Sequence, residues 1–201
     1  MEKEFNILIT GVGGQGVILM SELLGNAAVS DGLNIRGSEV LGMAVRGGPV
    51  LSMIRIGSEV YGPLIPTGKC DIEVALEPAE ALRNISYLSP STFVIVNTTK
   101  IVPTTVFLGQ SEYPSLEKIV EKLNMISGKV VILNATQIAL EAGSPLTTNV
   151  VMLGALFSSE RIPIKTETVK AAISEHFPPE RAAVNLKAFD LGYQMCREAF
   201  K

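Results

Sequence analysis

Cysteine, histidine and tryptophan are scarce or absent in this chain. Its 201 residues include two cysteines, one histidine and no tryptophan. Cys70 and Cys196 lie far apart in sequence, whereas iron–sulfur and structural zinc sites need about four ligands, usually in closely spaced pairs. We therefore expect no metal site within the chain and interpret both cysteines as buried apolar residues. The presence of His176 as the one histidine and the lack of a GxSxG motif also argue against a Ser-His-Asp hydrolase.

Long apolar runs and clusters of charge are lacking as well. No apolar run approaches the roughly 18 residues that a membrane-spanning helix needs. The formal net charge is -3 and the basic residues are scattered, which argues against a nucleic-acid-binding surface. The polar residues 1–5 have neither the basic start nor the apolar core of a secretory signal. We therefore expect a cytoplasmic protein that binds neither nucleic acid nor membrane.

Apolar residues, in contrast, are abundant. They make up 47% of the chain, charged residues make up 18%, and the mean hydropathy is +0.34. Two explanations stay open: a large protein–protein interface, or a thick α/β core with few exposed faces. An exposed apolar face would allow the isolated chain to form a homodimer. No stretch resembles a linker between two cores, so we expect a single domain over residues 1–201.

Short apolar runs alternate with segments of helical periodicity. We expect strands at residues 6–10, 34–40, 71–76, 92–97 and 129–134, and a β-hairpin that pairs residues 50–56 with residues 59–61. We expect helices at residues 17–30, 79–88, 115–125, 136–142, 150–158, 166–176 and 180–200. This order predicts an α/β fold, a three-layer sandwich with a mostly parallel sheet and a helical C-terminal part. The hairpin makes the sheet mixed.

A glycine-rich loop follows the first expected strand and opens the first helix. Its residues match the pattern GxGxxG, and the candidate cofactor-binding residues are Gly11, Gly13, Gly14, Gln15 and Gly16. Glycines permit positive φ and a close approach to the backbone, and the N–H groups of a helix N-terminus favour an anion. Dinucleotide binding also needs an acidic residue after the second strand, where Glu39 lies somewhat late. Alone, the loop is equally well explained as a tight structural turn.

A second glycine cluster occupies residues 37–49 and includes one arginine and one carboxylate. No helix or strand requires this composition, so we expect a functional loop. Arg46 could bind a phosphate or carboxylate with two hydrogen bonds. The alternative is a surface ion pair between Arg46 and Glu39, worth about 0–1 kcal/mol. The candidate binding residues from this segment are Ser38, Glu39, Arg46, Gly47 and Gly48.

The motifs together resemble the gamma domain of 2-oxoacid:ferredoxin oxidoreductases. The resemblance is carried by the loop at residues 11–16, Ser38-Glu39-Val40, Gly42-Met43, Arg46-Gly47-Gly48, the Ser-x-x-Arg of residues 52–55, and Asn185-x-x-Ala188-Phe189-x-x-Gly192. It spans nearly the whole chain. Pyruvate-type members tend to have arginines where this chain has Val12 and Val45, so its motifs are more similar to the indolepyruvate type.

The resemblance implies a reaction and a division of labour. The reaction is the CoA-dependent oxidative decarboxylation of an aryl 2-oxoacid, with thiamine diphosphate for the carbanion chemistry and iron–sulfur clusters that pass electrons to ferredoxin. This chain has no Gly-Asp-Gly…Asn thiamine motif, and two cysteines cannot ligate a cluster. We therefore expect no catalytic residues and no bound cofactor in this chain alone, and a larger partner subunit that carries both groups.

The share of the reaction expected for this chain is to shape the active-site cleft. The amides of residues 13–16, together with Gln15 and Arg46, are expected to face the partner's active site or a CoA phosphate. Two other functions remain open: a stand-alone NAD(P)-binding reductase that uses the glycine loop, and a non-enzymatic module that binds CoA or a nucleotide.

Overall fold

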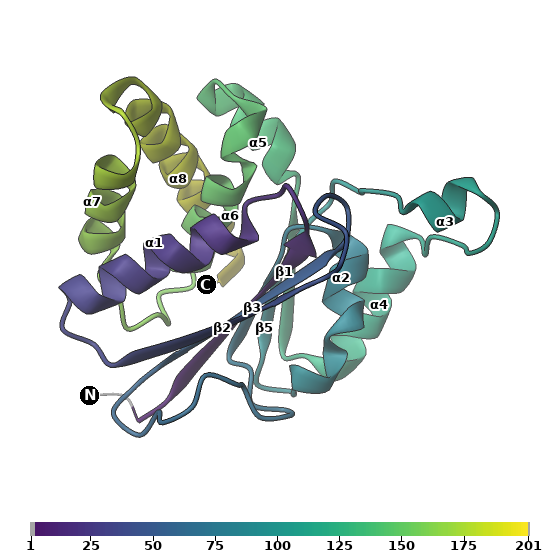
Figure 1. Ribbon diagram of the computed structural model, residues 1–201, viewed down its shortest axis with the longest axis horizontal. Coiled ribbons are helices and arrows are strands. Elements are labelled where there is room, and N and C mark those ends of the chain that lie inside the picture. The colour runs from purple at the N-terminus through teal and green to yellow at the C-terminus, as the bar shows by residue number, and fades with distance from the viewer. Residues whose placement is uncertain (1–2, 201) are drawn as a thin grey trace.

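A computed structural model describes residues 3–200; residues 1–2, from the polar start, and residue 201 lie outside it. Figure 1 shows a central sheet with helices on both faces. The strands are β1 (Phe5–Val12), β2 (Ile35–Leu41), β3 (Pro49–Ile56), β4 (Ile72–Ala75), β5 (Phe93–Asn97) and β6 (Lys129–Leu133). The helices are α1 (Val17–Ser30), α2 (Pro78–Arg83), α3 (Thr104–Phe107), α4 (Leu116–Ile126), α5 (Ala135–Ala142), α6 (Thr148–Phe157), α7 (Thr166–His176) and α8 (Pro179–Phe200), with short 3-10 turns at Ile85–Tyr87 and Pro145–Thr147.

The strand order is β2-β3-β1-β4-β5-β6. β1, β4, β5 and β6 pair in parallel, whereas β3 is antiparallel to both of its neighbours, β1 and β2. The expected α/β fold with a mixed, mostly parallel sheet is confirmed. All eight residues of β1 are buried, as is usual for a strand that helices cover on both faces.

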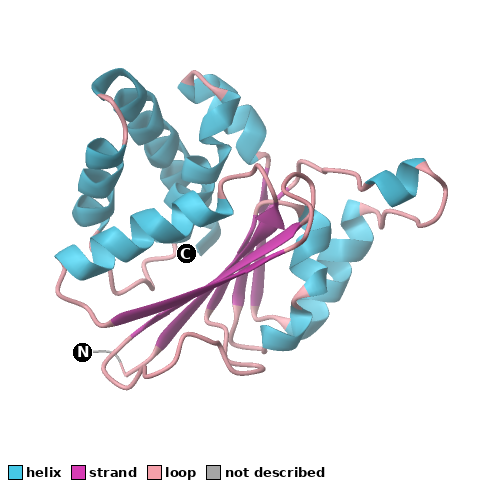
Figure 2. Cartoon of the chain, viewed as in Figure 1, coloured by secondary structure: helices cyan, strands magenta, loops and turns pink. Residues whose placement is uncertain are grey.

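The alternating side chains of β1 divide the core into two layers. Ile7 and Ile9 belong to the cluster that includes residues of α1 and α5–α8, and Leu8 belongs to the cluster under α2 and α4. The three layers and the helical C-terminal part are seen in Figure 2, where α3 stands at the end of a projecting loop. No helix within residues 3–200 is long and apolar enough to span a bilayer. The single-domain boundary at residues 1–201 stays a prediction.

The expected hairpin between residues 50–56 and 59–61 is wrong. β3 instead pairs with β2, residues 50–56 lying opposite residues 35–41, and with β1 on its other edge. Since both edges of β3 are occupied, residues 59–61 have no strand to join and form a turn and loop. The helix expected at residues 79–88 is also interrupted: α2 ends at Arg83, and Asn84 leaves the helical conformation. α3 was not expected.

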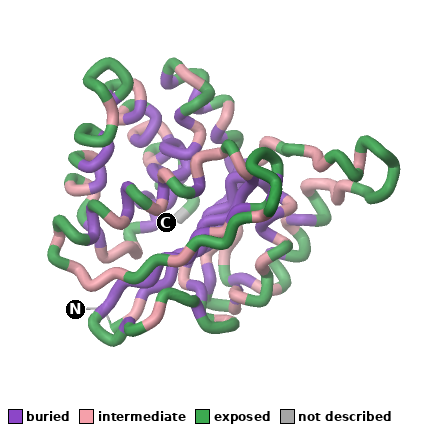
Figure 3. The backbone as a smooth tube through the Cα atoms, viewed as in Figure 1, coloured by how far each residue is buried: buried purple, intermediate pink, exposed green. Residues whose placement is uncertain are grey.

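Two glycines bring α6 and α8 into close contact. A Cβ atom on Gly154 would lie 2.0 Å from the carbonyl oxygen of Phe189, and one on Gly192 would lie 2.0 Å from that of Val151. Both positions therefore require glycine for steric reasons. This contact holds α6 and α8 together on the face of the sheet that α1 also covers. Figure 3 shows that buried backbone concentrates in the sheet, whereas the loop that joins β2 to β3 is exposed.

Candidate functional site

The glycine loop lies where the chain changes direction across the sheet. After β1 the chain passes through α1 to the side of the sheet that holds β2 and β3, and the other neighbour of β1 is β4. Ligands of open α/β sheets bind beyond the carboxyl ends of the strands at such a switch point. Gly14 and Gly16 have φ values of 100° and 80°, in the left-handed region that favours glycine. Both are needed to turn the chain from β1 directly into α1.

The structure brings the two predicted glycine segments together. The amide of Gly13 donates to the carbonyl of Gly48 at 2.8 Å, and the amide of Gly47 donates to the carbonyl of Gly13 at 3.1 Å. A Cβ atom on Gly13 would lie 2.4 Å from the carbonyl oxygen of Val45. Only glycine allows this approach. The glycine loop and the β2–β3 loop (residues 42–48) therefore form one unit, which we call the loop pair.

A cavity of about 490 Å³ opens at the loop pair, next to the N-terminus of α1. Backbone of the glycine loop and apolar side chains form its lining, among them Val17, Val45 and Val50. None of its lining residues, all within the described part of the chain, is ionisable. Such a site offers apolar contact, backbone N–H groups and the positive end of a helix dipole. It can bind and orient a ligand, but it holds no side chain for proton transfer.

The side chain of Gln15 is used within the chain. Its Oε1 accepts from the amide of Val12 at 2.9 Å, and its Nε2 donates to the carbonyl of Leu76 at 2.9 Å. Gly11 makes room for it, because a Cβ there would lie 2.9 Å from Gln15 Oε1. Gln15 thus ties the glycine loop to the end of β4. Its expected contact with a ligand stays a prediction.

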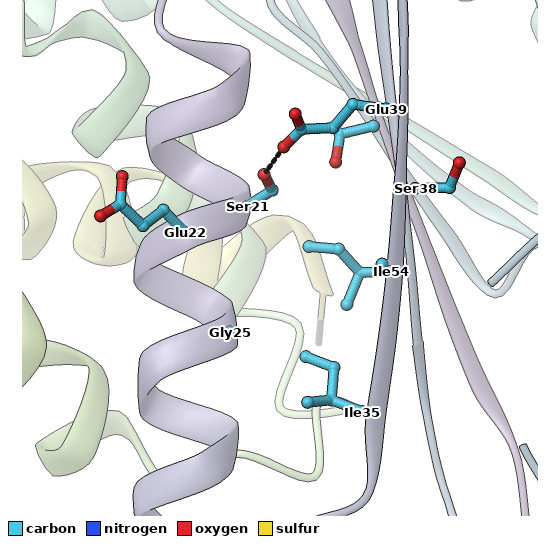
Figure 4. A pocket seen from close by; sticks show the side chains of 9 residues that line it. Ser21, Glu22, Gly25, Ile35, Ser38, Glu39 and Ile54 are labelled. Carbon is cyan, nitrogen blue, oxygen red and sulfur yellow. Dashed lines mark hydrogen bonds between the residues drawn. The ribbon is translucent and has the colours of Figure 1, made fainter.

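Ser38, Glu39 and Arg46 do not converge. Neighbouring residues of a strand face opposite ways, and in Figure 4 Glu39 points toward α1 while Ser38 points away from it. Ser21 donates to Glu39 Oε1 at 2.8 Å. Arg46 is exposed, and its side chain has no hydrogen bond or ion pair with a residue within 3–200. The alternative ion pair between Arg46 and Glu39 is therefore not formed, and the guanidinium group is available to a ligand or partner.

Sequence reasoning missed two asparagines that support the loops. Asn149, at the start of α6, is buried, and its Nδ2 donates to the carbonyl of Gly16 at 3.4 Å. Asn97, at the end of β5, donates to the carbonyl of Leu76 at 3.1 Å and accepts from the amide of Ala135 at 3.0 Å. The available signal was a polar residue at the end of an apolar segment. Such a signal does not predict to which group the side chain forms a hydrogen bond.

Glu73 is a buried acid of β4, on the face of the sheet that α2 and α4 cover. Thr10 donates to Glu73 Oε1 at 3.0 Å, and Oε2 has no hydrogen-bond partner among the described residues. Burial raises the pKa of Glu73 to about 8, and the hydrogen bond from Thr10 opposes the shift. The carboxyl group is therefore mostly protonated at neutral pH. It is not among the residues that line the cavity at the loop pair.

The residues present do not fit a metal centre. Across residues 3–200, no three or more His, Cys, Asp or Glu side chains are grouped so that they could hold a metal ion. Cys70 and Cys196 are buried in the two different core clusters, on opposite faces of the sheet. Burial raises the pKa of the Cys70 thiol well above its usual range and that of Cys196 to about 11. Neither side chain offers a thiolate near neutral pH.

The fold and the loop pair define an α/β domain with an apolar, glycine-lined cavity at the switch point of its sheet. The chain belongs to the pyruvate ferredoxin/flavodoxin oxidoreductase family, whose model matches residues 6–195. The resemblance inferred from the motifs is confirmed.

Relatives cover nearly the whole chain. It is 44% identical to the indolepyruvate oxidoreductase subunit IorB of Pyrococcus horikoshii over 98% of both chains. It is 45% identical to the IorB of Archaeoglobus fulgidus, over 94% of this chain and 93% of that one. The solved structure of pyruvate oxidoreductase subunit PORC from Thermotoga maritima has a TM-score of 0.71 at 26% identity, and the match covers 96% of this chain and 97% of that one.

Proposed function

We propose that this chain is a subunit of an indolepyruvate:ferredoxin oxidoreductase, which carries out the CoA-dependent oxidative decarboxylation of aryl 2-oxoacids. The observation that carries the proposal is the 44% identity to an indolepyruvate oxidoreductase subunit over 98% of both chains. The chain acts only as part of a complex. We place the complex in the cytoplasm, and we expect that without its partner the chain can pair with a second copy of itself.

The reactive groups lie on a larger partner subunit in this proposal. Thiamine diphosphate stabilises the carbanion, and iron–sulfur clusters carry electrons to ferredoxin. Two cysteines in the sequence, buried on opposite faces of the sheet, support this division, because a cluster usually needs four thiolates. What remains for this chain is to bind and orient a ligand, and to exclude water, at the edge of the partner's active site.

The loop pair performs that task. Within residues 13–16, the amides of Gly13 and Gln15 already donate to the carbonyls of Gly48 and Val12. The amides of Gly14 and Gly16 are left for a ligand at the N-terminus of α1, where a phosphate of CoA is favoured electrostatically. Arg46 is exposed on the same loop pair, without an ion-pair partner among residues 3–200, and can add a second positive contact. The apolar cavity of about 490 Å³ beside them suits an uncharged segment of the same ligand or a side chain of the partner.

The test is reconstitution with the associated large chain. A tagged version of this chain is purified from its native source, the large chain that accompanies it is identified, and both are produced together. The complex is assayed for ferredoxin reduction with indolepyruvate, pyruvate and a branched oxoacid, each with and without CoA. We expect kcat/KM to be highest for indolepyruvate and turnover to require CoA. A complex that prefers pyruvate contradicts the substrate assignment, and tight NADH binding by the isolated chain favours a stand-alone reductase.

A further inference from the structure

A second cavity lies beside the loop pair, between α1 and the β2–β3 ribbon. Its volume is about 370 Å³. Gly25 of α1 and Gly37 of β2 form facing parts of its walls, and a Cβ on Gly25 would have no neighbour within 4 Å. Two bare stretches of backbone thus leave a gap that side chains would otherwise fill. We call this cavity the glycine slot. It is lined by Gly25, Gly37, Ser21, Glu39, Ser52, Ile35 and Ile54, together with Glu22 and Ser38.

The remaining slot residues form an apolar floor and a polar end. Ile35 and Ile54 point from the strands toward α1 in Figure 4. At the polar end, Ser21 donates to one carboxylate oxygen of Glu39 at 2.8 Å. The second oxygen of Glu39 has no hydrogen bond to a described residue. A carboxylate accepts hydrogen bonds, so a ligand in the slot gains most if it brings an N–H group to this end.

Ser52 is an independent sign of a ligand. It is 1% exposed, it lines the slot, and its Oγ has no hydrogen-bond partner among residues 3–200. An unsatisfied buried hydroxyl group is unfavourable by about 1–3 kcal/mol. Ser52 also begins the Ser-x-x-Arg motif that the loop pair does not explain, whereas the arginine of that motif, Arg55, forms an ion pair with Glu4 at 2.7 Å. The hydroxyl of Ser52 is therefore placed for a group that enters the slot.

We propose that the glycine slot binds a planar nitrogen heterocycle that carries an N–H or NH₂ donor. Facing glycines favour a flat ring, the isoleucines contact its apolar edge, and Glu39 and Ser52 take its polar edge. A purine base of a nucleotide and an indole ring share this chemistry. The inference does not rest on the proposed function, because this chain alone forms the slot.

The variants follow from the geometry. Gly25→Leu fills the slot, and because the position is helical and open, this change is expected to leave the fold intact or stabilise it. Gly25→Ala brings the same gain in helix propensity and fills little of the slot, so it is the matched control. Ser52→Ala removes the unsatisfied hydroxyl, so the free chain is expected to unfold at an equal or higher temperature.

Adenosine and indole are the two probes, titrated separately into the full chain by saturation-transfer NMR and calorimetry. At least one is expected to bind saturably, and which one binds identifies the source of the ring. Gly25→Leu should weaken binding at least about tenfold, and Ser52→Ala roughly three- to tenfold, with Gly25→Ala close to wild type. The proposal is overturned if neither probe binds, or if Gly25→Leu folds and binds them as the wild type does.

Discussion

Glu73 gives a prediction whose size follows from the structure. It is fully buried in β4, and its neighbours across the sheet are Leu8 of β1 and Val94 of β5, both in the core. Its pKa rises from the ordinary 4.5 to about 8, so between these values the folded chain holds a proton that the unfolded chain has released. The contribution of the Glu73 proton to the free energy of unfolding is fully present below about pH 4.5 and is lost as the pH rises through about 8.

The magnitude is large for one residue. Roughly 3.5 pH units separate the two pKa values, and each unit corresponds to about 1.4 kcal/mol, so the loss is on the order of 5 kcal/mol. Glu73→Gln keeps the size of the side chain and the acceptor for Thr10, and its amide does not titrate. We expect the free energy of unfolding of the wild type, relative to Glu73→Gln, to fall by this amount between about pH 4.5 and pH 8.5.

Urea unfolding at a series of pH values measures this difference directly. The difference between the two proteins isolates Glu73 from other titrating groups. Glu121→Gln, an exposed position on α4, is the matched control and should follow the wild type at every pH. If wild type and Glu73→Gln lose stability in parallel as the pH rises, then the carboxyl group is not held protonated by burial.

Three further changes test the packing and the site. Gly13→Ala places a Cβ 2.4 Å from the carbonyl oxygen of Val45; the loop pair must separate, and turnover by the complex should fall tenfold or more, on the order expected when binding groups are misplaced by about 1 Å. Gly154→Ala places a Cβ 2.0 Å from the carbonyl oxygen of Phe189 and should lower the free energy of unfolding by about 3 kcal/mol or more in urea. Arg46→Ala should change stability by less than about 0.5 kcal/mol, yet raise KM for CoA roughly tenfold in steady-state assays of the complex.

Matched controls separate these effects from general damage. Gly62→Ala, at a position where a Cβ meets nothing within 4 Å, should leave both stability and turnover unchanged. Arg36→Ala removes an arginine of β2 that bonds to Asn34 and should not alter KM for CoA. If Gly13→Ala matches Gly62→Ala in activity, the loop pair is not part of the site. Unchanged KM values for both CoA and oxoacid in Arg46→Ala remove Arg46 from it.

Most of the helices and strands could be predicted from the sequence, because their signals are local. The apolar run and glycines at residues 6–16 predict a strand, turn and helix in that order, and the structure has β1, the glycine loop and α1 there. The partner of β3 could not be predicted, since pairing depends on a strand distant along the chain. A turn signal at Gly57 suggested a hairpin with the next residues, although β2 already occupied that edge.

The candidate site divides in the same way. Spacing predicts the first glycine segment and composition predicts the second, and the contact between Gly13 and Gly48 explains why both contain glycine. The sequence could not show that the side-chain amide of Gln15 forms hydrogen bonds with the backbone of Val12 and Leu76. Nor could it show that Ser38 and Glu39 face opposite ways. Glu73 did carry a local signal: a carboxylate within an apolar strand of a parallel sheet must be buried.

A single comparison of ferredoxin reduction shows whether the chemistry lies on the partner subunit. The isolated chain and the complex with its large partner are supplied with indolepyruvate and CoA at equal concentrations of this chain. We expect reduction by the complex and none by the chain alone. Ferredoxin reduction by the purified chain without its partner would contradict the assignment of the chemistry to another subunit.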